Sequence, residues 1–135
     1  MALETESIEL IPEVILKGVK SLISKPHHGF YLVAEVEGCT VASLMITNEW
    51  SDWRNGFFWW IQSVYVVAEW RRKGLYSKLY EEVKSLAQQH DDVCGYRLYV
   101  EHDNNVAQQA YQYLGMEETR YKLFEEMDSS KDFKK

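Results

Sequence analysis

Arg71-Arg72-Lys73-Gly74-Leu75-Tyr76-Ser77 joins a run typical of a strand, residues 57–67, to a run typical of a helix, residues 75–90. The first turn of a helix has backbone N–H groups without an intrahelical partner, and the helix dipole adds positive charge there. A glycine lets an anion approach the backbone closely, and Arg and Lys side chains add full charges. The stretch therefore predicts a phosphate or pyrophosphate site. The alternative is an ordinary solvated basic turn, and the flanking strand and helix favour the anion site.

The size and composition of the chain fit one compact domain, residues 1–135. Apolar residues make up 46% of the sequence, with five Trp and nine Tyr, which excludes a disordered chain. No apolar run approaches the roughly 20 residues of a membrane span. The N-terminal residues lack the basic-then-apolar order of a signal peptide, so we expect a cytoplasmic protein.

The net charge and the spacing of Cys and His residues indicate which kinds of ligand the chain is expected to bind. The formal net charge of −6 disfavours nucleic acid and favours a cationic small molecule. Against this background the basic stretch is a local exception. The two cysteines and four histidines show no metal-binding spacing, so no metal site is expected.

The periodicity predicts a mixed α/β fold in which three hairpin-connected strands precede a helix and a parallel crossover. Pro12 suits the first position of a helix, and Gly115 suits a left-handed helix cap. We expect a polar, aromatic loop over residues 48–56. The expected elements are a helix from residue 12 to 24, strands at 29–36, 40–47 and 57–67, a helix at 75–90, a strand at 96–100, a helix at 104–114 and a strand at 116–127.

Two motifs together resemble those of the GNAT superfamily of acyl-CoA-dependent N-acetyltransferases. Val64-Tyr65-Val66 followed by the basic stretch resembles its acetyl-CoA motif, an Arg or Gln, two residues, Gly, one residue, then Gly or Ala. Downstream, the chain resembles the second motif, Asn-x-x-Ala-x-x-x-Tyr-x-x-x-Gly. The matching residues are Asn104, Ala107, Tyr111 and Gly115.

The resemblance covers about residues 29–127 and implies a GNAT-like fold. That fold has a mostly antiparallel central sheet with a parallel splayed pair, flanked by helices. Two departures stand out. Tyr76 occupies a place that is usually Gly or Ala, which predicts a tighter phosphate loop or a displaced helix start. The usual first strand is absent before the first helix, so a second protomer could cover the exposed sheet edge, and we expect a homodimer.

The resemblance implies acetyl-CoA as co-substrate and assigns residues to it. The pantetheine arm would pair with the backbone of the strand before the basic stretch, and Asn104 would hydrogen-bond the arm. Backbone N–H groups from Arg72 to Ser77, with the basic side chains, would hold the pyrophosphate. The cofactor-binding residues expected in this way are Val64, Tyr65, Val66, Arg71, Arg72, Lys73, Gly74, Leu75, Tyr76, Ser77 and Asn104.

Acyl transfer to an amine also needs an oxyanion donor, a proton for the departing thiolate and a way to deprotonate the amine. A strand N–H near Val64 would be the oxyanion donor. Tyr111 resembles the family's general acid, and a phenol with a pKa near ~10 is protonated at neutral pH. The helical spacing of Tyr111 alone favours a buried aromatic residue on the inner face of a helix. The surrounding motif of Asn104, Ala107 and Gly115 favours the general acid instead.

The acceptor side centres on Glu49-Trp50-Ser51-Asp52-Trp53, where Trp50, Asp52 and Trp53 could form a cation-binding wall. Loop packing is the alternative for the two Trp residues. This segment is similar to the aromatic loop of the spermidine/spermine and thialysine acetyltransferase branch. Gln62 and Ser63 replace that branch's acidic pair, so a polyamine substrate is disfavoured. Glu49 and Glu101 are the substitute candidates for base or amine ligand, and solvated strand-end charges are the alternative.

These observations lead to one hypothesis with two alternatives. The chain is expected to transfer acetyl from acetyl-CoA to a primary amine of a small molecule, by direct attack within a ternary complex. Acetylation of a protein lysine or N-terminus is the alternative within enzymes. A non-catalytic acyl-CoA-binding protein is the alternative outside them, and the retained Tyr111 argues against it.

Overall fold

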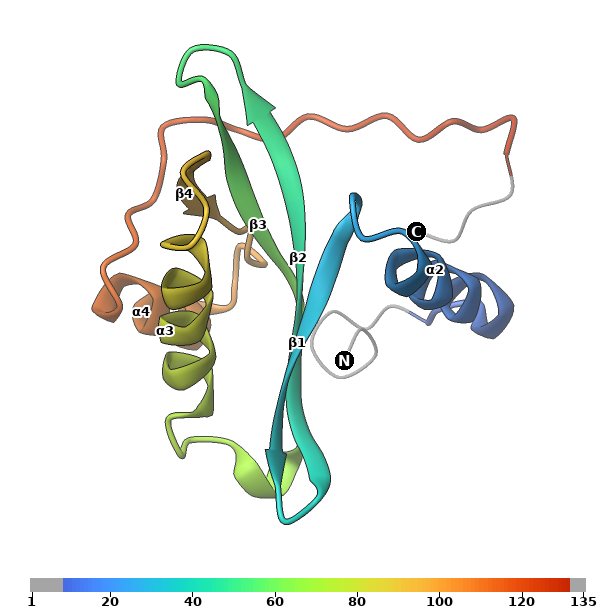
Figure 1. The fold of residues 1–135 in the computed structure, drawn as a ribbon. Helices are drawn as coiled ribbons and strands as arrows, with labels where there is room; N and C mark the ends of the chain where they lie inside the picture. Colours follow the sequence, from blue (N-terminus) through green and yellow to red (C-terminus); the bar gives the residue numbers. More distant parts are fainter. Residues whose placement is uncertain (1–8, 132–135) are drawn as a thin grey trace.

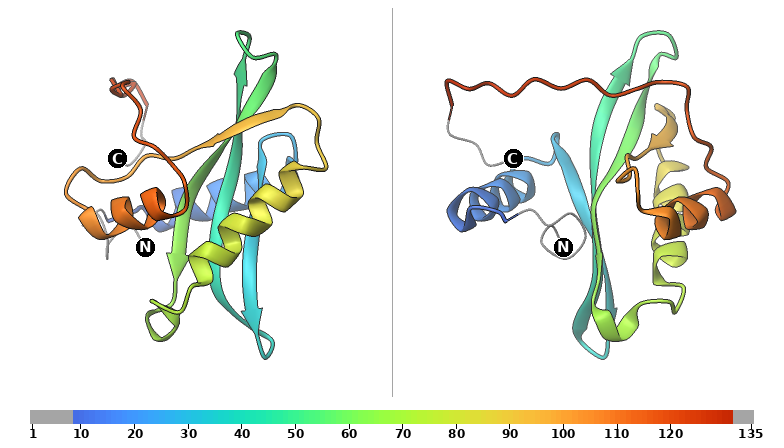
Figure 2. Two further views of the ribbon diagram at one scale, coloured as in Figure 1. Left: turned by 90° about the vertical axis from the view of Figure 1, so that its left-hand side faces the viewer. Right: turned by 180° about the vertical axis from the view of Figure 1, so that it is seen from behind.

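A four-stranded sheet in the order β1-β2-β3-β4 is the centre of the computed structural model, which describes residues 9–131 (Figure 1). Helices α3 and α4 lie on one side of the sheet and α2 on the other (Figures 1 and 2). The elements are α2 (Pro12–Ser24), β1 (Gly29–Val36), β2 (Cys39–Ser51), β3 (Gly56–Val66), the 3₁₀-helix η1 (Ala68–Trp70), α3 (Leu75–Ala87), β4 (Val93–Arg97) and α4 (Asn105–Tyr113).

Two tight turns make the first three strands an antiparallel meander. Glu37 and Gly38 both have positive φ, 52° and 81°, which is the backbone of a two-residue hairpin turn. Asn55, with φ 49°, turns β2 into β3. The connection through α3 is longer, and β4 returns parallel to β3. The predicted mixed layout, including the parallel pair, is confirmed.

The core lies between the sheet and α3. Leu79, Val83 and Ala87 recur every four residues of α3 and are buried, because this spacing puts them on one face of the helix. They pack onto alternate residues of β2, of which Leu44 and Ile46 are fully buried. Since side chains alternate across a strand, the intervening residues face the opposite side of the sheet.

The β3–β4 ladder is short and ends inside β3. It runs from Phe57 opposite Val93 to Trp60 opposite Arg97, and β3 then continues to Val66 without β4. A bulge against β2 follows, because Leu44 faces both Ser63 and Val64, and Ser63 has φ 50°. The fork between β3 and β4 is the predicted splayed pair.

Three sequence-based boundaries need correction. Residues 48–51 are strand and not loop, because Trp50 pairs with Phe57 and Ser51 with Gly56. The strand expected at 96–100 lies at 93–97, where it forms its ladder with the start of β3. The strand expected at 116–127 is wrong, because this segment joins no ladder. It crosses in extended form from the α3–α4 side to the α2 side (Figures 1 and 2).

The sequence predicts that the usual first strand of the family is missing, and the structure tests this only from residue 9 onward. Within residues 9–131 no strand precedes α2, and residues 1–8 lie outside the described part of the chain. None of the helices in residues 9–131 is long and apolar enough to cross a membrane.

Gly29 offers a test of the β1–β2 pairing. Its φ is 150°, and an added Cβ would lie 1.9 Å from the carbonyl oxygen of Ile46. We expect Gly29→Ala to lower the free energy of unfolding by about 2 kcal/mol or more, measured by urea titration. Gly18→Ala is the matched control, because a Cβ on Gly18 of α2 meets nothing within 4 Å. That change should stabilise by about 1 kcal/mol, and equal stability of the two variants would contradict the observed register.

Candidate active site

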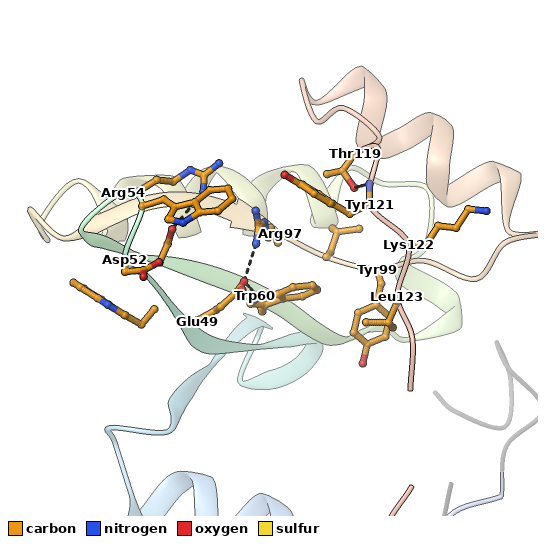
Figure 3. Close-up of a pocket in the computed structure, with 14 residues that line it drawn as sticks. Glu49, Asp52, Arg54, Trp60, Arg97, Tyr99, Thr119, Tyr121, Lys122 and Leu123 are labelled. Carbon is orange, nitrogen blue, oxygen red and sulfur yellow. Dashed lines mark hydrogen bonds and ion pairs between the residues drawn. The ribbon is translucent and has the colours of Figure 1, made fainter. Parts of the chain in front are cut away.

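An open cleft of about 500 Å³ lies at the hairpin end of β3 (Figure 3). We call it the aromatic cleft. It is lined by residues 49–54 of the β2–β3 hairpin, by Trp60, by residues 97–99 and by part of the extended segment 119–123. The cleft therefore reaches the Trp60–Arg97 pair, where β3 and β4 part.

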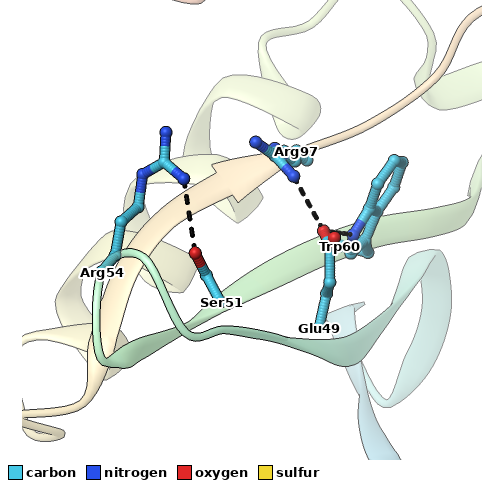
Figure 4. Close-up of polar contacts among 5 residues, drawn as sticks. All are labelled: Glu49, Ser51, Arg54, Trp60 and Arg97. Atoms are coloured by element: carbon cyan, nitrogen blue, oxygen red, sulfur yellow. Dashed lines mark hydrogen bonds and ion pairs between the residues drawn. The ribbon is translucent and has the colours of Figure 1, made fainter.

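Glu49 is held by two donors at the centre of this cleft (Figures 3 and 4). Trp60 Nε1 donates to its Oε1 at 2.8 Å and Arg97 Nη1 donates to the same oxygen at 2.9 Å. The hydrogen bond from Trp60, followed by that from Arg97 and its charge, lowers the pKa of Glu49. A carboxylate with a lowered pKa is a weak proton acceptor, so Glu49 suits a fixed negative charge better than a general base.

Three of the four predicted acceptor residues meet at the aromatic cleft. Trp50, Asp52 and Trp53 all line it, together with Glu49. The Trp50 ring packs edge-on against Phe57 at 5.0 Å, whereas Trp53 is 85% exposed. Gln62 does not line the cleft, because its Nε2 donates to Thr47 Oγ1 at 2.6 Å further along β3.

The basic stretch 71–77, which we call the phosphate loop, forms a second cleft of about 190 Å³ with Val66, Trp70, Ala110 of α4 and the α4 C-cap Leu114. Lys73 is the one residue of the stretch that does not line it, and its Nζ lies 4.9 Å from the Trp70 ring centroid. Gly74 is the N-cap of α3 in the left-handed conformation, with φ 76° and no side-chain cap. The first α3 bond runs from Lys78 N to Gly74 O. The N–H groups of residues 75–77 therefore stay outside the helical ladder, which is the anion-binding arrangement that the sequence predicts.

Tyr76 does not displace the helix start, since α3 begins at Leu75 directly after Gly74. Its ring instead packs inward, 6.2 Å from Tyr80 and 5.4 Å from Tyr111. The Tyr76 hydroxyl is buried and has no hydrogen-bond partner among the described residues. Burial raises the pKa of Tyr111, so its phenol keeps its proton at neutral pH. The Tyr76 ring, which departs from the family motif, thus packs against Tyr111, and Tyr111 itself lines neither cleft.

Glu101 and Asn104 lie in the loop before α4, and neither lines the two clefts. The Glu101 side chain is exposed, and its backbone oxygen accepts from Asn104 N at 3.0 Å. Asn104 Oδ1 accepts from Ala107 N at 3.2 Å, which makes Asn104 the N-cap of α4. The structure thus gives Asn104 a role in the fold, and its predicted contact with a ligand stays a prediction.

The cleft residues that were not expected from the sequence include two arginines and three aromatic residues, Arg54, Arg97, Trp60, Tyr99 and Tyr121. The pairing of Trp60 with Arg97 would have indicated the cleft, but it depends on the register of two strands that are distant in sequence. Within residues 9–131, no three His, Cys, Asp or Glu side chains come together as a metal site would require.

Comparisons with known proteins now bear on this geometry. The sequence profile of the Acetyltransferase (GNAT) family matches residues 4–116. The solved structure of "a possible acetyltransferase" from Clostridium difficile 630 is 45% identical, with 94% of this chain and 84% of that chain covered and a TM-score of 0.87. No curated protein sequence matches the chain.

More distant solved structures share the fold. Aminoglycoside 6'-N-acetyltransferase AAC(6')-IG from Acinetobacter haemolyticus is 16% identical, with 87% of this chain and 82% of that chain covered and a TM-score of 0.72. Glucosamine-6-phosphate N-acetyltransferase from Arabidopsis thaliana is 21% identical, with 89% and 81% covered and a TM-score of 0.67.

The polar centre of the aromatic cleft generates a prediction about Glu49. Trp60→Phe keeps a ring and removes the Nε1–H donor, so the pKa of Glu49 should rise toward its ordinary value of 4.5. Side-chain carboxyl carbon NMR titration measures this pKa directly. Trp50→Phe, in the same cleft without a bond to Glu49, should leave it unchanged. An unchanged Glu49 pKa in Trp60→Phe would refute the hydrogen-bond explanation.

Proposed function

The chain belongs to the acetyltransferase (GNAT) family, and from this premise we propose that it transfers an acetyl group from acetyl-CoA to a primary amine of a small molecule. One observation carries the proposal. Strand β3 connects the aromatic cleft, at Trp60, to the phosphate loop, at Val66, and between them only its edge toward β2 is paired, because the β4 ladder has ended. A basic anion site and an amine-sized cleft thus share one strand with available backbone groups.

The residues present fit acetyl-CoA. The N–H groups of residues 75–77 and the Arg72 side chain would hold the pyrophosphate, with Gly74 leaving open space beside the backbone. The backbone of residues 64–66 would pair with the pantetheine arm, since β4 does not occupy that edge. The Val66 carbonyl oxygen accepts from Arg71 Nε at 2.9 Å, so the arm would use that oxygen only by replacing this contact. Bound acetyl-CoA supplies the acetyl group as a thioester.

The proposed chemistry uses few protein groups. The amine nitrogen attacks the thioester carbonyl carbon, a C–N bond forms and the C–S bond breaks. The Val64 N–H, which the bulge takes out of the β2 register, stabilises the developing oxyanion. Tyr111 gives its phenolic proton to the departing sulfur, and a solvent proton replaces it. The amine loses its own proton to water, because the pKa of Glu49 is lowered.

Direct attack within a ternary complex agrees with the positions of the cysteines. Cys39 and Cys94 are exposed, and neither lines the two clefts. A covalent acyl-cysteine step therefore has no nucleophile at hand. We also propose that residues 1–135 form one domain. A homodimer and a cytoplasmic location stay predictions from the sequence.

Tyr111→Phe tests the assignment of the general acid. The ring contact with Tyr76 remains while the proton donor is lost, so amine-dependent thiol release should fall by about 100-fold or more. Stabilisation by CoA in thermal melts should persist. Because the pKa of Tyr111 is raised from 10.0, the wild-type acid should stay protonated up to at least about pH 10.

Tyr113→Phe is the matched control, since Tyr113 lies on the same helix and is 89% exposed. Full turnover by Tyr111→Phe across this pH range would remove Tyr111 from the mechanism. Stabilisation by CoA without thiol release on any amine would favour the non-catalytic alternative.

A further inference from the structure

Two arginines that line the aromatic cleft lie against the same ring, that of Phe58, which does not itself line the cleft. The guanidinium carbon of Arg97 lies 3.6 Å from the centroid of the Phe58 ring, and that of Arg54 lies 5.0 Å from the same centroid. Phe58 is only 8% exposed, so its ring is a fixed platform for both cations. Two like charges that line one cleft are stabilised by an anion that lies near both of them.

The protein pairs only one of these two charges in a direct ion pair, and the Glu49 carboxylate acts on Arg54 at longer range. Glu49 pairs with Arg97 at 2.9 Å. Among residues 9–131 no carboxylate lies within 4.0 Å of Arg54, whose Nη1 donates only to Ser51 Oγ at 3.3 Å (Figure 4). Arg97 itself has five N–H donors, and its hydrogen bond to Glu49 uses one of them. Donors and positive charge therefore remain available at this place.

The side chains that line the whole aromatic cleft also have a net positive charge. The cleft has three cationic side chains, Arg54, Arg97 and Lys122, against two carboxylates, Glu49 and Asp52. The chain as a whole carries a net charge of −6, so the cleft is locally positive in a negative protein. A diamine or polyamine would bring further positive charge to these arginines, which disfavours such acceptors.

We propose that the acceptor amine also carries an anionic group, a carboxylate or a phosphate, which Arg54 and Arg97 bind in the aromatic cleft. This inference rests on the proposed acetyl transfer. The planar guanidinium fork matches both anions and gives charge-assisted hydrogen bonds. The aromatic walls, with Trp50 and Tyr121, accommodate the carbon skeleton between the anion and the amine.

Matched acceptor pairs test the anionic group. Amine-dependent thiol release from acetyl-CoA is measured for the common amino acids and their α-amides, and for 2-amino sugars with and without a 6-phosphate. Putrescine serves as the diamine. We expect kcat/KM for the anionic member of the preferred pair to exceed that of the neutral member by about tenfold or more. The pair that responds distinguishes a carboxylate from a phosphate.

Arg54→Gln assigns the effect to the cleft. Arg54 is exposed and does not contact Glu49, so the fold and the Glu49 contacts should survive. The variant should lose about tenfold in kcat/KM for the anionic acceptor and little for its neutral partner. Thermal stabilisation of the free protein by the anionic acceptor should weaken in parallel. Lys20→Gln on α2 removes the same charge far from the cleft and should keep the wild-type preference.

Each outcome has a distinct meaning. Thiol release with equal rates for both members of every pair, or with putrescine preferred, would overturn the anion site and leave acetyl transfer standing. An unchanged preference in Arg54→Gln would overturn its assignment to the two arginines. If none of the amines causes thiol release from acetyl-CoA, the proposed function itself would be overturned.

Discussion

β3 loses its neighbour β4 after the Trp60–Arg97 pair, and the rest of the site depends on this parting of two strands. A parallel ladder that continued to Val66 would occupy the backbone that the proposed acetyl-CoA arm needs. The bulge at Ser63 interrupts the β2–β3 register at Leu44, and regular pairing with β2 resumes at Tyr65. The same stretch of β3 carries both the proposed oxyanion donor, the Val64 N–H, and the proposed binding edge.

Packing of α3 and α4 on one side of the sheet places the phosphate loop beside the fork (Figure 1). The fully buried Val83 of α3 fastens that helix to Leu44 and Ile46 of β2, which places the phosphate loop beyond the end of β3. The Tyr76–Tyr111 ring contact ties the first turn of α3 to α4. The side chain that departs from the family pattern therefore connects the proposed anion site to the proposed acid.

Local patterns predicted much of this fold and part of the site. Helical spacing and caps indicated α2, α3 and α4, and the Gly115 cap is present with φ 99°. Such local patterns could not predict which residues of distant elements contact each other. The Arg97–Glu49 pair joins residues 48 apart, and no local signal encodes it. Residues 116–127 alternate like a strand, yet a strand also needs a free edge beside it, and this segment joins none.

Amide hydrogen exchange with and without CoA tests the central claim most directly. The account predicts that CoA increases protection at the backbone amides of residues 75–77 and 64–66, while the amides of α2 do not change. Protection confined to the aromatic cleft, or none in either segment at saturating CoA, would contradict the assignment of the fork and the phosphate loop to acetyl-CoA.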